Sequence, residues 1–393
     1  MVIPFDRSDS PSSVKEPILH SCLTQSANQQ PSNIVNNHTG HQLSNNSSFR
    51  SLSMKLHHDY GTSCDEERDL IDCLGRSELK AVRSHADLAK TVHTVRTLNK
   101  SLNRATVQLG IEKVVIITKA RDNSLVYLTK ELTEWLLQTY PNMTVYVDKK
   151  LASSCRFNCS GLRKDIPSAN TRLKYWTRAS LGSDSENISF VITLGGDGTV
   201  LHASTLFQTV VPPIVSFSLG SLGFLTNFDF EDFRDVLGKS ISDGVNTDLR
   251  MRFTCRVHSA NGDILEEQQV LNELTIDRGP SPYVTMLELY GDGELLTVAQ
   301  ADGLIVATPT GSTAYNLSAG GSLVHPEVSG ICITPICPHT LSFRPVMVPD
   351  SMVLRIKVPE RSRSTAWAAF DGRERVEIKQ GEYVSVKASI FPF

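Results

Sequence analysis

The spacing of apolar residues changes near residue 245, and this change limits the fold more than any other feature of the sequence. Before it, short runs of β-branched residues alternate with stretches in which apolar residues recur three or four positions apart, the period of a helix. After it, apolar and polar residues alternate, which is the period of a strand with one buried face. The sequence therefore predicts an α/β segment followed by an antiparallel β segment.

The α/β segment starts with a strand–helix–strand pattern. Val114–Ile117 is a run of β-branched residues, typical of a strand that is buried on both faces. Apolar residues recur at helical spacing from Leu125 to Leu136, Pro141 ends that helix, and 143–147 forms the next predicted strand. Two strands that are joined by a helix in this way pair in parallel.

Two further predicted strands, 188–194 and 214–217, flank a glycine-rich turn and a helix that runs through Leu206. We therefore expect a Rossmann-like α/β domain over residues 105–240, with the Gly-Gly-Asp-Gly loop between one of its strands and the following helix.

The remaining residues, 241–393, predict an antiparallel β-sandwich-like domain. Segments 284–290 and 294–298 alternate around Gly291-Asp292-Gly293, which predicts a hairpin. Segment 353–358 is another alternating strand, and 376–379 and 383–387 predict a second hairpin across 380–382. The sequence leaves open whether the last strands return to the first domain.

The first 64 residues are rich in Ser, Asn and Gln and show no sustained apolar period. Such a composition buries too little apolar surface to offset its ordering entropy, so we predict a disordered tail over 1–64. Scattered leucines over 65–104 predict a short helical lead-in to the folded part.

The overall charge and apolar runs argue against several classes of protein. With 39 basic and 42 acidic residues the net charge is −3, which argues against nucleic-acid binding driven by charge. The longest apolar run, Ala366–Phe370, is too short to cross a membrane. The start of the chain lacks the pattern of a secretory signal and is acidic and poor in arginine, which favours a cytoplasmic location and leaves a mitochondrial one open.

A glycine-rich loop follows a predicted buried strand and precedes a helix, and its residues are Gly195, Gly196, Asp197, Gly198 and Thr199. Glycines let backbone N–H groups approach a phosphate, and a helix N-terminus adds further donors. A carboxylate would repel that phosphate, so Asp197 needs another role: accepting a proton from a hydroxyl group or holding a cation. A tight turn with a capping Asp is the alternative. The Gly-x-x-x-x-Gly-Lys-Ser/Thr phosphate loop is absent from the sequence.

A second candidate element, Thr308–Tyr315, follows the predicted strand 302–307. Its small hydroxyl residues and its tyrosine suit close approach to a sugar or a flat ring. A Ser/Thr-capped turn is the alternative. Two short motifs are uninformative alone: Asn272-Glu273 fits a surface polar pair, and Phe370–Arg373 fits a hairpin turn. The eleven histidines show no metal-ligand spacing, so the sequence does not identify metal ligands.

In this order, the four elements resemble the NAD kinase family, and the resemblance spans Lys113–Phe393. It includes Leu219–Thr226, Asn272-Glu273 and the whole Thr308–Tyr315 run, whereas 334–345 resembles the eukaryotic members in particular. The Gly-Asp-Gly alone is shared with lipid kinases and phosphofructokinase-type kinases.

The resemblance implies ATP-dependent phosphorylation of the adenosine ribose 2′-hydroxyl of NAD, with NADH as an open second acceptor. It implies Mg²⁺ as cofactor and a homo-oligomer, a dimer, tetramer or larger, built through the β domain. By position, Asp197 resembles the general base, and the glycine-rich loop contacts phosphate. The positions that match NAD-contacting residues of the family are Asn272, Glu273, Asp302, Thr313, Ala314, Tyr315, Asn316, Leu317, Ser318 and, more weakly, Arg373.

The sequence departs from the family at Gln300 and Arg373, where some bacterial relatives carry Arg and Gln, and family members usually continue beyond the segment that matches Ser389–Phe393. A lipid kinase of the diacylglycerol or sphingosine type remains an alternative enzyme, although the hydroxyl-rich 308–318 run favours a polar nucleotide. An inactive nucleotide sensor is the alternative of another class, although such a sensor would gain nothing from a carboxylate at Asp197.

Overall fold

The computed structural model of the chain describes residues 106–107, 110–119, 122–340 and 343–393. All of them belong to one unit, Leu88–Phe393. The predicted tail over 1–64 and the predicted lead-in over 65–104 lie outside the described residues.

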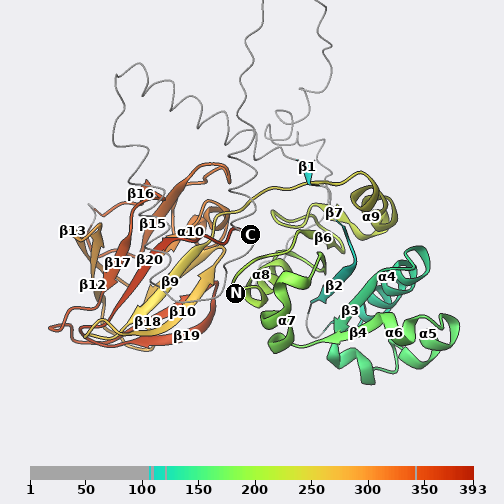
Figure 1. Cartoon of the computed structure of the whole chain (residues 1–393). Coiled ribbons are helices and arrows are strands. Elements are labelled where there is room, and N and C mark those ends of the chain that lie inside the picture. Colours follow the sequence, from blue (N-terminus) through green and yellow to red (C-terminus); the bar gives the residue numbers. More distant parts are fainter. Residues whose placement is uncertain (1–105, 108–109, 120–121, 341–342) are drawn as a thin grey trace, which may run out of the picture. The chain divides into compact units, whose positions relative to one another are not determined.

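The first part of the described chain, here called the α/β half, alternates strands and helices (Figure 1). Its strands are β1 (Thr106–Val107), β2 (Lys113–Thr118), β3 (Thr144–Asp148), β4 (Leu173–Trp176), β5 (Phe190–Leu194), β6 (Ile214–Ser218), β7 (Phe228–Asp229) and β8 (Val245–Asn246). Its α-helices are α4 (Leu125–Thr139), α5 (Cys159–Asp165), α6 (Ala169–Arg172), α7 (Arg178–Asp184), α8 (Asp197–Leu206) and α9 (Phe233–Ser242). Short 3₁₀ helices cover Lys149–Ser153, Ser185–Asn187 and Phe230–Asp232.

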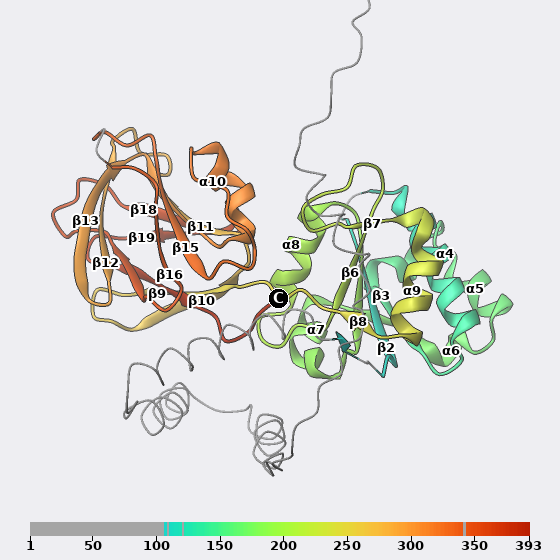
Figure 2. The same cartoon turned by 90° about the horizontal axis from the view of Figure 1, so that it is seen from above.

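Six of these strands form one parallel sheet in the order β4-β3-β2-β5-β6-β7. The order reverses between β2 and β5, as it does in doubly wound nucleotide-binding sheets. Alternate residues of β2 face opposite cores: Val114 and Ile116 pack with α4 and α9, and Val115 and Ile117 pack with α7 and α8. Helices therefore cover both faces of the sheet (Figure 2), which explains why the predicted strands are apolar throughout.

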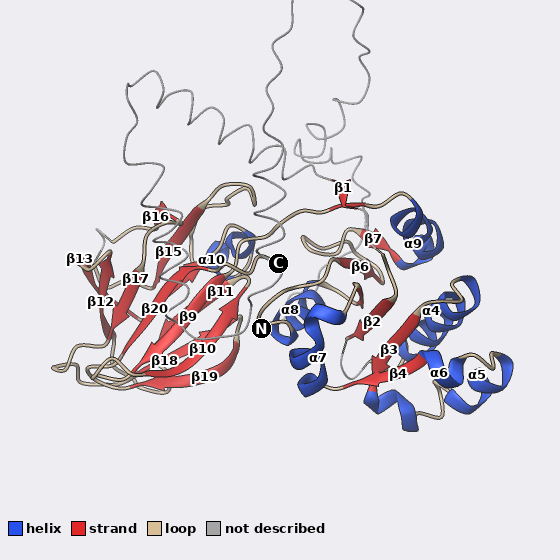
Figure 3. Cartoon of the chain, viewed as in Figure 1, coloured by secondary structure: helices blue, strands red, loops and turns tan. Residues whose placement is uncertain are grey.

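In the second part, here called the β half, the regular structure consists of strands and two short helices (Figure 3). Its strands are β9 (Phe253–His258), β10 (Ile264–Val270), β11 (Glu273–Asp277), β12 (Thr285–Gly291), β13 (Glu294–Ala301), β14 (Gly303–Ala307), β15 (Gly330–Ile336), β16 (Val346–Pro349), β17 (Leu354–Lys357), β18 (Ala366–Phe370), β19 (Arg373–Ile378) and β20 (Tyr383–Ala388). Its short helices are the 3₁₀ helix Thr310–Thr313 and α10 (Tyr315–Ser318).

These strands build two antiparallel sheets of six, β10-β9-β20-β17-β12-β13 and β16-β15-β14-β11-β18-β19. One apolar core lies between them, with Phe253 and Leu289 from the first sheet and Leu274 and Phe370 from the second. The strand alternation that the sequence shows after residue 245 therefore reflects one face on this core and one face outside it. The predicted class, a Rossmann-like α/β domain and a β-sandwich-like domain, is confirmed.

The second predicted hairpin is wrong, although both of its strands exist. β19 pairs with β18, and β20 pairs with β9 and β17 in the other sheet. The turn 380–382 crosses between the sheets: Gly381 has a φ of +84°, and its N–H donates to the Val358 carbonyl at 2.8 Å. A period of two fixes which face is buried but not which neighbour a strand pairs with.

The last strands thus remain in the two antiparallel sheets and do not join the parallel sheet. The final residues continue this pairing, because Arg250 and Phe393 exchange backbone hydrogen bonds at 2.7 and 2.8 Å. Among the described residues, no helix is long and apolar enough to cross a membrane.

Candidate active site

The Gly-Gly-Asp-Gly loop lies at the carboxyl end of β5, where the strand order reverses. The N–H of Lys119, directly after β2, donates to the Leu194 carbonyl at 3.0 Å and brings the end of β2 beside the loop. Gly195 has a φ of +145°, and a methyl group there would overlap the Thr199 hydroxyl. Gly196 precedes α8, and Asp197 is the first residue of that helix. Crevices at such reversals are where open α/β sheets bind ligands.

Three donors from the following loop hold the Asp197 carboxylate. Oδ2 accepts the Phe224 N–H at 2.9 Å, and Oδ1 accepts the Leu225 N–H and the Thr226 hydroxyl, both at 3.0 Å. A methyl group at Gly223 would overlap this carboxylate. One donor on Oδ2 leaves that oxygen room to accept another proton. Asp197 is partly exposed, so a substrate can reach it.

These orienting donors were not predicted as site residues. The sequence signal was present in the Leu219–Thr226 run, whose two glycines and threonine follow β6. Without the fold, nothing connects this run with a carboxylate that lies more than 20 residues earlier.

Asn272 and Glu273 form the second part of the candidate site. Both residues are buried, and Asn272 Oδ1 and Glu273 Oε2 are buried oxygens without a hydrogen-bond partner. Burial, with the nearby Asp371 carboxylate, raises the pKa of Glu273 to about 7. Unpaired buried acceptors are costly in a folded protein, and a ligand that donates hydrogen bonds would satisfy them.

Asp371 fixes the backbone of this pair. Its carboxylate accepts the N–H groups of Leu271, Asn272 and Glu273 at 3.0, 2.7 and 3.2 Å. Burial raises the pKa of Asp371. Asp371 and Gly372 both have positive φ and form the turn between β18 and β19, so the hairpin turn predicted at 370–373 is confirmed. The Asp-Gly pair signalled the turn, but the pattern did not show that the carboxylate reaches β11.

The threonine-rich run lies directly against Asn272 and Glu273. The Thr308 N–H donates to the Asn272 carbonyl at 2.9 Å, and the Thr308 hydroxyl donates to the Leu271 carbonyl at 2.6 Å. The Tyr315 N–H donates to the Glu273 carboxylate. A methyl group at Gly311 would overlap the Asn272 carbonyl, so this close approach requires glycine.

The predicted ligand contacts in this run differ in exposure. Tyr315, Leu317 and Ser318 are exposed, and Thr313 and Ala314 are half-buried. Asn316 is fully buried, and its amide bonds to the Ser312 and Ser322 carbonyls and to the Thr334 hydroxyl. In this structure Asn316 therefore holds the run in place.

Asp302 lies away from the pair. Ala307 pairs with Glu273, whereas Asp302 precedes the other end of β14, five residues or roughly 16 Å away. Its carboxylate pairs with the Arg278 guanidinium at 3.1 Å. Within one chain the structure thus does not bring Asp302 together with Asn272 and Glu273.

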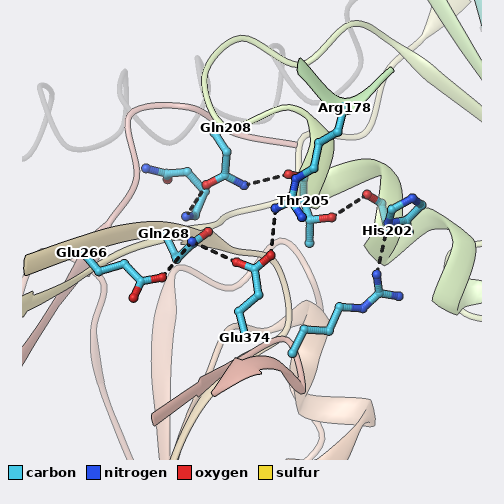
Figure 4. Close-up of polar contacts among 9 residues, drawn as sticks. Arg178, His202, Thr205, Gln208, Glu266, Gln268 and Glu374 are labelled. Carbon is cyan, nitrogen blue, oxygen red and sulfur yellow. Dashed lines mark hydrogen bonds and ion pairs between the residues drawn. The ribbon is translucent and has the colours of Figure 1, made fainter. Parts of the chain in front are cut away.

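Arg373 connects the hairpin turn with the helix of Asp197. Figure 4 shows the neighbouring contacts of Arg178, Gln268 and Glu374. Its guanidinium donates to His202 Nδ1 at 3.1 Å and to the Gly198 carbonyl at 3.5 Å. Burial, Arg373 and Arg178 lower the pKa of His202, which keeps Nδ1 available as the acceptor. Glu374 bonds to Arg178 at 2.8 Å and to Gln268 at 3.0 Å. Polar contacts therefore join the two halves beside the glycine-rich loop.

Two family models match the chain. The N-terminal domain of ATP-NAD kinases matches residues 114–245, and the C-terminal domain of ATP-NAD kinases matches residues 271–393. The chain belongs to the NAD kinase family. The resemblance that the sequence motifs indicated is thereby confirmed, and both parts of the candidate site lie inside the matched residues.

Individual NAD kinases and related kinases support this assignment. NAD(+) kinase of Saccharomyces cerevisiae is 48% identical over 81% of this chain, and the chain spans 63% of that relative's length. A kinase of Schizosaccharomyces pombe is 36% identical over 82% of this chain and 84% of its own length. The crystal structure of yeast NADH kinase with NADH is 34% identical, has a TM-score of 0.62, and covers 71% of this chain and 81% of its own.

Proposed function

We propose that this chain is an NAD kinase that transfers the γ-phosphoryl group of ATP to the adenosine ribose 2′-hydroxyl of NAD or NADH. The observation that carries the proposal is the pair of unpartnered buried oxygens on Asn272 and Glu273, covered by a run rich in hydroxyl groups. A polar nucleoside satisfies these acceptors, whereas a lipid acceptor leaves them unpaired. Yeast NADH kinase, a structural neighbour with NADH bound, supports the choice of acceptor.

The residues of the β half bind and orient the acceptor. Asn272 and Glu273 accept hydrogen bonds from the adenosine part of NAD, and the exposed ring of Tyr315 packs against a flat part of the ligand. Arg373 reaches Gly198 and holds the binding half against the loop that contacts phosphate. Because both reactants are then held in a fixed orientation, the reaction between them becomes effectively unimolecular.

Asp197 is the general base of the proposed reaction. The 2′-hydroxyl donates its proton to Oδ2, the 2′-oxygen forms a bond to the γ-phosphorus, and the bond from that phosphorus to the β–γ bridging oxygen breaks. ADP leaves with the electron pair, and Asp197 then releases the proton to solvent. The donors Phe224, Leu225 and Thr226 fix the carboxylate in one orientation for this transfer.

The backbone N–H groups of Gly196 and Gly198, at the start of α8, bind phosphate oxygens of ATP. Those of Gly195 and Thr199 donate to the Phe217 and Gly196 carbonyls at 3.0 and 2.8 Å and fix the shape of the loop. The described residues hold no group of three or more His, Cys, Asp or Glu side chains that forms a metal site. The Mg²⁺ of the proposed reaction would bind mainly through the phosphate oxygens of ATP, which leaves the Asp197 carboxylate as the base. When bound with ATP, Mg²⁺ neutralises charge on the phosphoryl oxygens.

A direct assay tests the proposal: the native chain with ATP, Mg²⁺ and NAD should form NADP. Diacylglycerol and sphingosine are the control acceptors and should not be phosphorylated. Phosphorylation of a lipid in place of NAD would contradict the proposed acceptor, and NAD binding without turnover would indicate a nucleotide sensor. Comparing NAD with NADH at equal concentration decides the preferred redox form.

We further propose a homo-oligomer that assembles through the β half and a cytoplasmic location for the protein. Light scattering of the purified chain measures its mass in solution. Fractionation of cells that express the chain shows its location, and recovery in the mitochondrial fraction would contradict the cytoplasmic one.

A further inference from the structure

A fully buried arginine lies where the β half begins. Arg252 directly precedes β9, and its side chain is 0% exposed. Its guanidinium donates to three carbonyls: Phe207 at 2.6 Å, Thr209 at 2.9 Å and Phe391 at 2.8 Å. Burial lowers the pKa of Arg252 to about 10, so the side chain remains charged at neutral pH. A charge this deeply buried is kept only where its hydrogen bonds are satisfied.

Two of the three acceptors lie at the carboxyl end of α8. Phe207 is the C-cap of that helix, and Thr209 follows two residues later. The last carbonyls of a helix lack partners within the helix and carry its negative dipole, so a buried guanidinium suits this position. Gln208 adds a further link, because its side-chain oxygen accepts the Gln269 N–H at 2.9 Å.

The other end of α8 carries Asp197. Ten residues at about 1.5 Å each place the anchored end roughly 15 Å from the reacting carboxylate. Arg252 itself is continuous with β9, which belongs to the half that holds Asn272 and Glu273. A shift of the anchored end would therefore move Asp197 relative to the bound acceptor.

We propose that Arg252 is a positioning residue that fixes helix α8, and with it Asp197, against the half that binds the acceptor. Arg252 touches neither substrate. Its effect is on the alignment of bound reactants, where an error of about 1 Å costs roughly a hundredfold in rate. The inference rests on the proposed function for its kinetic consequence, but the anchoring of α8 is measurable without turnover.

The chain contains a matched control. Arg172 also binds the carboxyl end of a helix, because its guanidinium donates to the carbonyls of Leu137, Tyr140 and Met143 near the end of α4. That helix carries no candidate site residue. Arg172→Met and Arg252→Met therefore remove the same kind of anchor from two helices, only one of which bears Asp197.

The experiment measures kcat, the KM for NAD, the KM for ATP and hydrogen exchange in the full chain. We expect Arg252→Met to lower kcat at least tenfold, with both KM values within threefold of the native values. Exchange should accelerate in α8. Arg252→Lys keeps the positive charge but lacks the planar guanidinium with its several N–H donors, so it should recover part of kcat. Arg172→Met should accelerate exchange in α4 and leave kcat within twofold.

A kcat within twofold of native for Arg252→Met overturns the proposal, and so does an equal loss of kcat in Arg172→Met. If Arg252→Met does not fold, Arg252→Lys tests the proposal in its place: its kcat should fall below the native value while both KM values stay within threefold. If the native chain forms no NADP, the proposed function fails separately. In that case the exchange data decide alone: unchanged protection of α8 in the Arg252 variants overturns the anchoring.

Discussion

At the scale of single residues, the Asp197 carboxylate carries the chemistry of the proposed reaction. Asp197→Asn removes proton acceptance and should lower kcat by roughly 10²–10⁴, the usual contribution of general acid–base catalysis. NAD affinity measured by calorimetry should change little. The amide keeps one acceptor oxygen for the Leu225 and Thr226 donors, while its NH₂ group faces the Phe224 N–H. We therefore also expect a lower melting temperature.

Asp229→Asn is the control for this substitution, because Asp229 also accepts a backbone N–H at the start of a helical turn, from Glu231 at 3.1 Å. Its kcat should remain near the native value. A rate of Asp197→Asn that high Mg²⁺ partly restores would assign Asp197 to metal binding instead. A near-native rate at the same Mg²⁺ concentration as the native chain would exclude Asp197 from catalysis.

The buried Glu273 makes stability depend on pH. Its pKa is about 7 in the folded chain against an ordinary value of 4.5, so the folded state holds this proton more tightly than the unfolded state does. The stability that Glu273 contributes is complete below pH 4.5 and is lost as the pH rises to about 7. Glu273→Gln cannot ionise. We therefore subtract the free energy of unfolding of the native chain from that of Glu273→Gln. This difference should be larger at pH 8 than at pH 5, by on the order of 3 kcal/mol.

Urea unfolding at both pH values measures this difference in the ligand-free chain. Asp371 is present in both proteins, so its own titration largely cancels. Glu294→Gln, at the exposed start of β13, serves as the control and should give the same small change at both pH values. An unchanged or reversed difference for Glu273→Gln would show that Glu273 is ionised when buried.

At the scale of elements, the close approach of the threonine-rich run to Asn272 depends on a glycine. A methyl group at Gly311 would overlap the Asn272 carbonyl, carbon and Cα, and backbone atoms cannot move aside without shifting β11 or the run. Gly311→Ala should therefore raise the KM for NAD at least tenfold and change the KM for ATP by less than threefold. Steady-state kinetics with each substrate varied in turn gives both values.

Gly238→Ala is the matched control, because a methyl group on this residue of α9 meets nothing within 4 Å. Alanine in a helix is favoured over glycine by about 1 kcal/mol, so this variant should be slightly more stable and fully active. An equal rise of both KM values in Gly311→Ala would mean that the whole cleft has loosened.

The sequence predicted most elements of this fold because their apolar period is strong. β2, α4, β5 and α8 have the type and nearly the bounds that the pattern indicates. Strand pairing was harder to predict from the sequence. Segments 376–379 and 383–387 have the pattern of a hairpin but belong to different sheets. Two adjacent alternating strands carry the same signal whether they pair or cross between layers, so the distinction needs the tertiary structure.

At the scale of the whole molecule, the candidate site is assembled from segments that are far apart in the chain. The motifs at 195–199, 272–273 and 308–318 could be identified as chemistry-bearing because glycine, hydroxyl and carboxylate residues gather there. The roles of Asp371 and Arg252 could not, since each acts through backbone groups that lie far away in sequence. Long-range contacts of this kind leave no local pattern.

The positions of the site residues in the chain also indicate which segments of the molecule are needed for turnover. The candidate site residues lie within 195–373, and the Ser-, Asn- and Gln-rich composition of residues 1–60 predicts a tail without a binding site. A variant that starts at Arg104 should therefore keep kcat/KM within tenfold of the native chain. Removing Ser389–Phe393 is the opposite test, because it deletes the Phe391 carbonyl bonded to Arg252 and the pairing of Phe393 with Arg250. That variant should lose more than tenfold in kcat, with circular dichroism confirming that both proteins are folded. A large loss in the N-terminal variant would assign a catalytic role to the first 103 residues.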